Sequence, residues 1–98
     1  MRTVKVPCLA EKGLFSDELI ITLNTEKGGR QFFISESNYT PKANGRTEPP
    51  QFTGYVNALV LRQDGPLLTL SIPGEPADLF VSKIWMKNED VFSSADEQ

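Results

Sequence analysis

Residues 18–35, ELIITLNTEKGGRQFFIS, decide the fold. Alternate residues of the first half are apolar, so Leu19, Ile21 and Leu23 share one face of an extended chain. The segment 25–29, TEKGG, follows, and its two glycines can adopt the positive φ that tight turns need. The second half, RQFFIS, is again rich in residues that favour strands. The stretch therefore predicts a β-hairpin over residues 18–35.

The same patterns mark four further strands, predicted over residues 3–6, 54–63, 67–72 and 80–87. Seven glycines and seven prolines interrupt the chain, and no window shows sustained apolar residues at helical spacing. We therefore expect an all-β fold of six antiparallel strands with little or no helix. In a chain of 98 residues, six strands protect their edges best in a small barrel or a tight sandwich, of the SH3-like or OB-like kind.

Two prolines and one apolar pair shape the expected connections. Pro7 is expected to end or bend the first strand, because proline cannot donate a ladder hydrogen bond. Leu14 and Phe15, in the turn-rich connector that follows, are expected to pack into the core. Because Pro66 lacks an N–H, a loose loop is expected over residues 63–66 rather than a tight hairpin.

The length indicates a single domain. We assign it to residues 1–90 and expect residues 91–98 to form an acidic, flexible C-terminal tail. Residues 36–52, with three prolines and few apolar side chains, form the longest irregular stretch. A loop of that length in a small domain is either functional or mobile.

The absence of histidine excludes several kinds of chemistry. Without imidazole, no Ser–His or Cys–His nucleophilic pair can form. A single cysteine, Cys8, can build neither a zinc site nor an internal disulfide, and we expect it to fill space near the first strand. No catalytic residue, metal ligand or cofactor is predicted, so the chain is not expected to be an enzyme.

The charge balance narrows the range of partners. Ten Lys and Arg residues stand against thirteen Asp and Glu residues, a net charge of −3. Duplex DNA is not an expected partner, because its binders neutralise several phosphates. The longest apolar run, residues 58–61, is too short for a membrane span or a signal-peptide core. We expect a cytoplasmic protein without membrane attachment, either a monomer or a homodimer paired through the strand at 54–63.

The long loop supplies the candidate contact surface. Aromatic and basic side chains occur within it and just after it, where a rigid barrel could present them to a partner. The leading hypothesis is a non-catalytic protein-interaction or accessory module. The predicted contact residues are Tyr39, Lys42, Arg46, Phe52 and Tyr55.

A second hypothesis is single-stranded RNA or DNA binding through residues 27–46. This region interleaves glycine, basic and aromatic residues, and such surfaces stack bases on exposed rings while cations follow the phosphates. In the competing interpretation, Phe32 or Phe33 is a core residue and the charges are ordinary surface. The sequence leaves both interpretations open.

Overall fold

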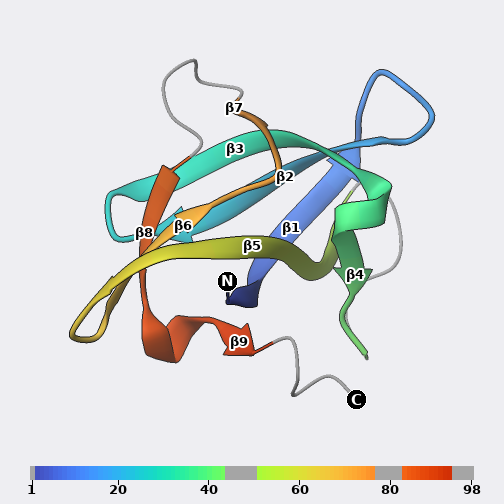
Figure 1. Cartoon of the computed structure of the whole chain (residues 1–98). Coiled ribbons are helices and arrows are strands. Elements are labelled where there is room, and N and C mark those ends of the chain that lie inside the picture. Colours follow the sequence, from blue (N-terminus) through green and yellow to red (C-terminus); the bar gives the residue numbers. More distant parts are fainter. Residues whose placement is uncertain (1, 44–50, 77–82, 94–98) are drawn as a thin grey trace.

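The computed structural model describes residues 2–43, 51–76 and 83–93. This part of the chain holds nine β-strands, two short 3₁₀ helices and no α-helix, which confirms the all-β prediction (Figure 1). No helix within it is long and apolar enough to cross a membrane. The elements are β1 (Thr3–Lys12), β2 (Glu18–Thr25), β3 (Gly28–Ser35), η1 (Glu36–Asn38), β4 (Tyr39–Pro41), β5 (Phe52–Asp64), β6 (Leu67–Ser71), β7 (Gly74–Pro76), β8 (Lys83–Lys87), η2 (Asn88–Asp90) and β9 (Phe92–Ser93).

The strands form one antiparallel sheet that curls into a half-barrel (Figure 1). Its order is β7-β3-β2-β1-β5-β6-β8, while β4 pairs with β5 and β9 pairs with β1. The curl brings the β2–β3 turn against β8, where the Glu26 N–H donates to the Trp85 carbonyl at 2.9 Å. The expected small, barrel-like architecture is therefore present.

The hairpin predicted over residues 18–35 is confirmed. The strands pair from Glu18 opposite Ser35 to Thr25 opposite Gly28, which leaves a two-residue turn. Gly28, the first residue after the turn, has a φ of +102°, which glycine adopts without steric cost. The Thr25 hydroxyl donates to the Gly28 carbonyl at 2.7 Å and accepts the Lys27 N–H at 3.1 Å. These two bonds hold the turn from inside.

The core fills the concave side of the half-barrel with side chains from alternate positions of the long strands. Phe32, Ile21 and Leu68 are fully buried, and no polar or charged residue is buried in the described part of the chain. Phe32 is thus a core residue, as one of the two interpretations of the 27–46 region requires. The core consists of Val4, Val6, Cys8, Ala10, Leu19, Ile21, Leu23, Phe32, Ile34, Val56, Ala58, Leu68, Leu70, Ile72, Ile84 and Met86.

Of the two effects expected of Pro7, the ending of the first strand is wrong, because β1 continues to Lys12. The Val60 N–H donates to the Arg2 carbonyl at 2.8 Å, so the backbone of Arg2 faces β5. Successive residues of a strand aim their backbone groups to opposite edges. Pro7 lies five positions further along an unbroken register, so its nitrogen faces away from β5. The β1–β5 ladder therefore loses no hydrogen bond at the proline.

The prediction of a loose loop over residues 63–66 is also wrong. Asp64 pairs directly with Leu67, so only Gly65 and Pro66 form the turn. The N–H that closes such a turn belongs to the residue after it, here Leu67, so the proline does not remove the closing hydrogen bond. Gly65 supplies the positive φ, +61°, that the first turn position needs. The Pro66 carbonyl accepts the Asn88 N–H at 2.7 Å.

Leu14 and Phe15 do not pack into the core as expected. Leu14 is 89% exposed and Phe15 is 67% exposed. The loop closes on itself, because the Gly13 N–H donates to the Glu18 carbonyl at 2.9 Å and the Glu18 N–H donates to the Phe15 carbonyl at 3.1 Å. This short closed turn points both apolar side chains outward.

Three short strands, β4, β7 and β9, add to the six that were predicted. Two or three residues are too few to show an alternation, so each depends on a neighbour distant in sequence. β4 lies within the expected loop 36–52, and residues 44–50 of that loop lie outside the described residues. Of the segment 91–98, Phe92 and Ser93 pair with β1, while residues 94–98 lie outside the described part.

Gly54 lets Tyr39 pack over the inner face of the sheet. It is buried and lies opposite Cys8 in β1 and Pro41 in β4. A Cβ at this position would overlap the Tyr39 hydroxyl and the Thr40 carbonyl oxygen. Only glycine therefore allows this three-strand contact.

We predict that Gly54→Ala lowers the free energy of unfolding by about 1–3 kcal/mol, the usual cost of overpacking. Urea denaturation measures the change. Gly29→Ala is the matched control, because a Cβ there would meet only the Leu23 carbonyl at 3.9 Å. Equal stability of the two variants would contradict the close approach of Tyr39 to Gly54.

Candidate functional site

Strand β1 has one partner along one edge and two partners along the other. It pairs with β5 from Thr3 to Ala10. On its other edge it pairs with β9 at Val4 and Lys5, and with β2 from Leu9 to Lys12. Residues 6–8 lie between these two partners. We call this place the fork.

The fork opens where the next hydrogen bond of the β1–β2 ladder would need an N–H from Pro7. Leu9 pairs with Thr22, so the same register would place Pro7 opposite Asn24. Backbone groups of successive residues point to opposite edges of a strand, so the backbone groups of both residues point into the gap. Pro7 has no N–H to donate, and β2 instead continues toward β8. The missing donor therefore coincides with the point at which the two strands separate.

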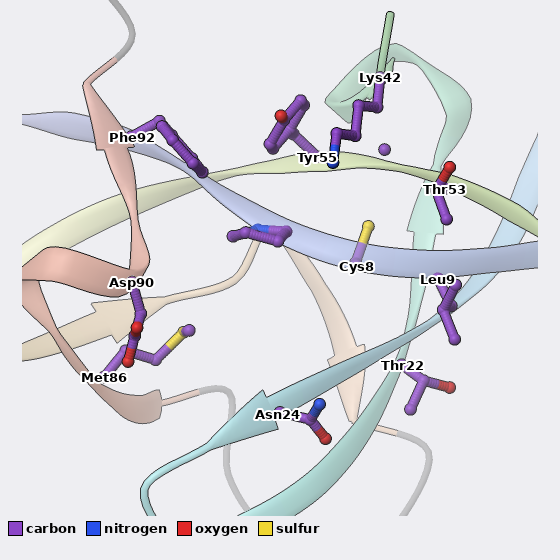
Figure 2. A pocket seen from close by; sticks show the side chains of 12 residues that line it. Cys8, Leu9, Thr22, Asn24, Lys42, Thr53, Tyr55, Met86, Asp90 and Phe92 are labelled. Atoms are coloured by element: carbon purple, nitrogen blue, oxygen red, sulfur yellow. The ribbon is translucent and has the colours of Figure 1, made fainter. Parts of the chain in front are cut away.

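A groove of about 570 Å³ occupies the fork (Figure 2). The strands β1, β2 and β5 form one part of its wall, the segment from β8 to β9 forms another, and Lys42, just after β4, completes it. We call it the fork groove. It is lined by Pro7, Cys8, Leu9, Thr22, Asn24, Lys42, Thr53, Gly54, Tyr55, Met86, Asp90 and Phe92.

Apolar side chains that face solvent form one part of this lining. Leu9 is 39% exposed and Phe92 is 44% exposed. The rings of Tyr55 and Phe92 meet edge to face, with centroids 5.4 Å apart and planes at 76°. Such pairs hold aromatic rings in a defined orientation. The groove thus offers a rigid apolar surface on strands rather than on a loop.

Two opposite charges lie on different sides of the groove (Figure 2). Lys42 follows β4 and lies beside Tyr55, while Asp90 ends η2 near Met86. Neither forms an ion pair with a residue in the described part of the chain. Both charges are therefore available to a ligand.

Cys8 lines the groove but is only 7% exposed. Burial raises the pKa of its thiol from 9.0 to about 12, so the thiol is protonated at neutral pH. A nucleophilic cysteine needs the thiolate, so Cys8 cannot supply one here. Burial also raises the pKa of Tyr39, with a smaller contribution from Cys8. The Tyr39 hydroxyl is buried and has no hydrogen-bond partner in the described part.

The five residues predicted as a contact surface do not all lie together. Lys42 and Tyr55 both line the fork groove. Tyr39 and Phe52 are partly buried and pack against the core. Arg46 lies outside the described residues.

Sequence reasoning missed Pro7, Leu9 and Phe92 as lining residues. One signal was present: the alternation of Val4, Val6, Cys8 and Ala10 continues past the proline, which indicates an unbroken strand with Leu9 on its outer face. Phe92 carried no comparable signal, because its position depends on pairing with the opposite end of the chain.

No group of three or more Cys, Asp or Glu side chains in the described ranges could hold a metal ion.

Comparison with protein-family models, with curated proteins and with solved structures gave no match. The interpretation of the groove therefore depends on its own residues.

We predict that Pro7→Val extends the β1–β2 ladder into the fork, because the new N–H can donate to the Asn24 carbonyl. One added hydrogen bond should raise the free energy of unfolding by about 0.5–1.5 kcal/mol. Hydrogen exchange followed by NMR should show the residue 7 amide exchanging as slowly as its strand neighbours. Fast exchange at residue 7 would show that the proline does not cause the separation.

We also predict that stability falls between pH 9 and pH 12 partly through Cys8. Its folded-state pKa of about 12 lies above the ordinary value of 9.0, so the unfolded chain ionises first as the pH rises. Below pH 9 the thiol is neutral in both states, so no stability is lost through Cys8. Above pH 9 the free energy of unfolding falls by up to about 1.4 kcal/mol per pH unit. Urea denaturation at pH 8, 9.5 and 10.5 should give a steeper loss for wild type than for Cys8→Ala. Parallel losses would refute a buried neutral thiol.

Proposed function

We propose that the protein is a non-catalytic interaction module that holds an extended segment of a partner protein in the fork groove. The observation that carries this proposal is the apolar surface of the exposed Leu9 and Phe92 and the half-buried Tyr55, set between Lys42 and Asp90. Large apolar side chains exposed together mark binding surfaces more often than they mark ordinary protein surface.

The form of the groove favours an extended peptide. An apolar side chain of the peptide would pack on Leu9 and Phe92, while its flanking charges would meet Lys42 and Asp90. The Asn24 backbone faces the opening and offers both an N–H and a carbonyl to a strand-like segment. These are the groups through which proteins recognise extended chains.

Two features support binding rather than catalysis. The Cys8 thiol is protonated at neutral pH, and the sequence contains no histidine to act as a base. The described carboxylates form no cluster around the groove, where Asp90 is the one acidic lining residue. We also propose a reducing compartment such as the cytoplasm, because a lone buried thiol needs no oxidising environment.

Single-stranded nucleic acid is the less favoured ligand. In the region 27–46, Phe32 belongs to the core and offers no face for stacking. Lys27 lies over the Trp85 ring at 5.5 Å, and Lys12, near this region, is paired with Glu36 at 3.1 Å. Within the described part of the region, Lys42 is the one cation with neither an ion pair nor a ring contact that could follow a phosphate backbone.

We predict that the double variant Leu9→Thr and Phe92→Ala binds its protein partner with an affinity lower by about tenfold or more, because it removes the central apolar contacts. Quantitative affinity capture from a native lysate measures the loss. Leu61→Thr is the matched control, since Leu61 is 40% exposed on β5 and does not line the groove. Photo-crosslinking from position 92 should label the same partner.

Equal capture by the wild-type and double-variant proteins would count against the fork groove. Polarisation titrations with single-stranded oligonucleotides at two salt concentrations address the other hypothesis. Binding that strengthens at low salt and requires Lys42 would favour nucleic acid over a protein segment.

A further inference from the structure

The loop between β1 and β2 carries the most exposed large apolar side chains in the described part of the chain. Leu14 is 89% exposed and Phe15 is 67% exposed. They lie at the opposite end of β1 from its pairing with β9, and neither lines the fork groove. The fork groove therefore does not account for them.

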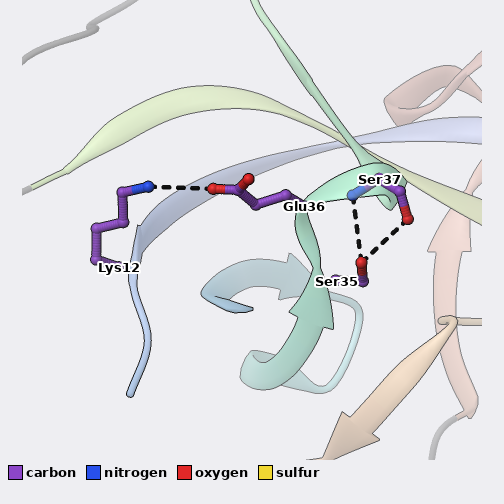
Figure 3. A network of polar contacts seen from close by, with 4 residues as sticks. All are labelled: Lys12, Ser35, Glu36 and Ser37. Atoms are coloured by element: carbon purple, nitrogen blue, oxygen red, sulfur yellow. Dashed lines mark hydrogen bonds and ion pairs between the residues drawn. The ribbon is translucent and has the colours of Figure 1, made fainter. Parts of the chain in front are cut away.

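Hydrogen bonds hold this loop in place. Besides its internal backbone bonds, the Leu14 N–H donates to the Glu18 carboxylate at 3.0 Å. The Glu36 N–H donates to the Asp17 carbonyl at 2.8 Å, which joins the loop to the end of β3. The Lys12–Glu36 ion pair at 3.1 Å adds a second link between these segments (Figure 3). Leu14 and Phe15 are thus displayed by an anchored turn.

A second groove, of about 360 Å³, runs from this loop along β3 and β7. We call it the loop groove. Its apolar contacts come from Phe15 and the partly buried Phe33. Its residues are Phe15, Asp17, Glu18, Phe33, Ile34, Ser35, Gly74 and Glu75.

The charge of the loop groove has one sign. Asp17, Glu18 and Glu75 are the charged residues among its lining, and no Lys or Arg from the described ranges lines it. Lys12, which lies beside the loop, is neutralised by its ion pair with Glu36. The groove thus combines an exposed aromatic ring with three carboxylates.

We propose that the loop groove binds a basic segment of a partner protein, in which an aromatic or aliphatic residue is flanked by Lys or Arg. The apolar residue would pack between Phe15 and Phe33, and the flanking cations would meet Asp17 and Glu75. Complementary charge at the rim of an apolar contact favours such a partner and disfavours acidic ones.

The same charges disfavour two other occupants. A second copy of this chain has a net charge of −3 and would bring carboxylates against carboxylates if the same loops met. An anionic membrane surface would repel Asp17 and Glu75 while Phe15 approached it. A basic peptide segment satisfies both the apolar and the charged parts of the groove.

The test selects ligands from a displayed library of random 12-residue peptides against the full-length wild-type protein, with prior depletion on the double variant Phe15→Ser and Glu75→Lys. We expect enriched peptides to carry at least two Lys or Arg next to an aromatic or aliphatic residue. Polarisation titration of the most enriched peptide should show tighter binding at low salt. Phe15→Ser should weaken binding about tenfold, and Glu75→Lys several-fold.

Phe92→Ala is the matched control, because it removes an exposed aromatic ring from the fork groove and should leave this affinity unchanged. Thermal unfolding verifies that each variant is folded, which is expected since Phe15 is mostly exposed.

The proposal is overturned by enrichment of acidic peptides, by no enrichment, or by affinity unchanged in Phe15→Ser. It is also overturned if wild-type dimers in sedimentation are lost in Phe15→Ser, or if anionic vesicles bind and no peptide does. Loss of partner capture at the fork groove leaves this result unaffected, so the two proposals fail separately.

Discussion

The missing N–H of Pro7 is the constraint on which the arrangement of the sheet depends. Because the proline nitrogen faces away from β5, β1 keeps an unbroken ladder on that side. On the other side the same residue interrupts the row of donors, and two different strands share that edge. The same residue therefore leaves the β1–β5 ladder of the ten-residue strand intact and lies where its second edge passes from β9 to β2.

That division allows the sheet to curl as it does. If β2 followed β1 along its full length, its far end could not also reach β8. Instead β2 leaves β1 after Thr22, and the next turn donates a hydrogen bond to Trp85. Among the described residues the core on the concave side is wholly apolar, so the polar side chains of the same strands lie outside it. The fork groove is a consequence of this geometry and needs no dedicated loop.

The strands that could be predicted from sequence are those with period-two alternation, since burial on one face leaves that pattern in any strand of five or more residues. Lys42 and Tyr55 could be predicted as contact residues because the cation lies within the irregular segment 36–52 and the ring lies just after it. The edge of β1 that the Pro7 nitrogen faces could not be predicted, because it depends on the pairing of Arg2 with Val60. The outward turn of Leu14 and Phe15 depends on hydrogen bonds whose geometry no local pattern encodes.

The core next to this loop has no space for Leu14 and Phe15. The core residues at the end of the half-barrel next to this loop, Leu19 and Ile34, are already at most 5% exposed. Turning the loop inward would break its bonds to Glu18 and Glu36 and would overpack that layer. Retaining two apolar side chains in water also has a cost, roughly 1.5–3 kcal/mol for a large side chain relative to its burial. A small domain with marginal stability can recover that cost when the residues are covered by a partner.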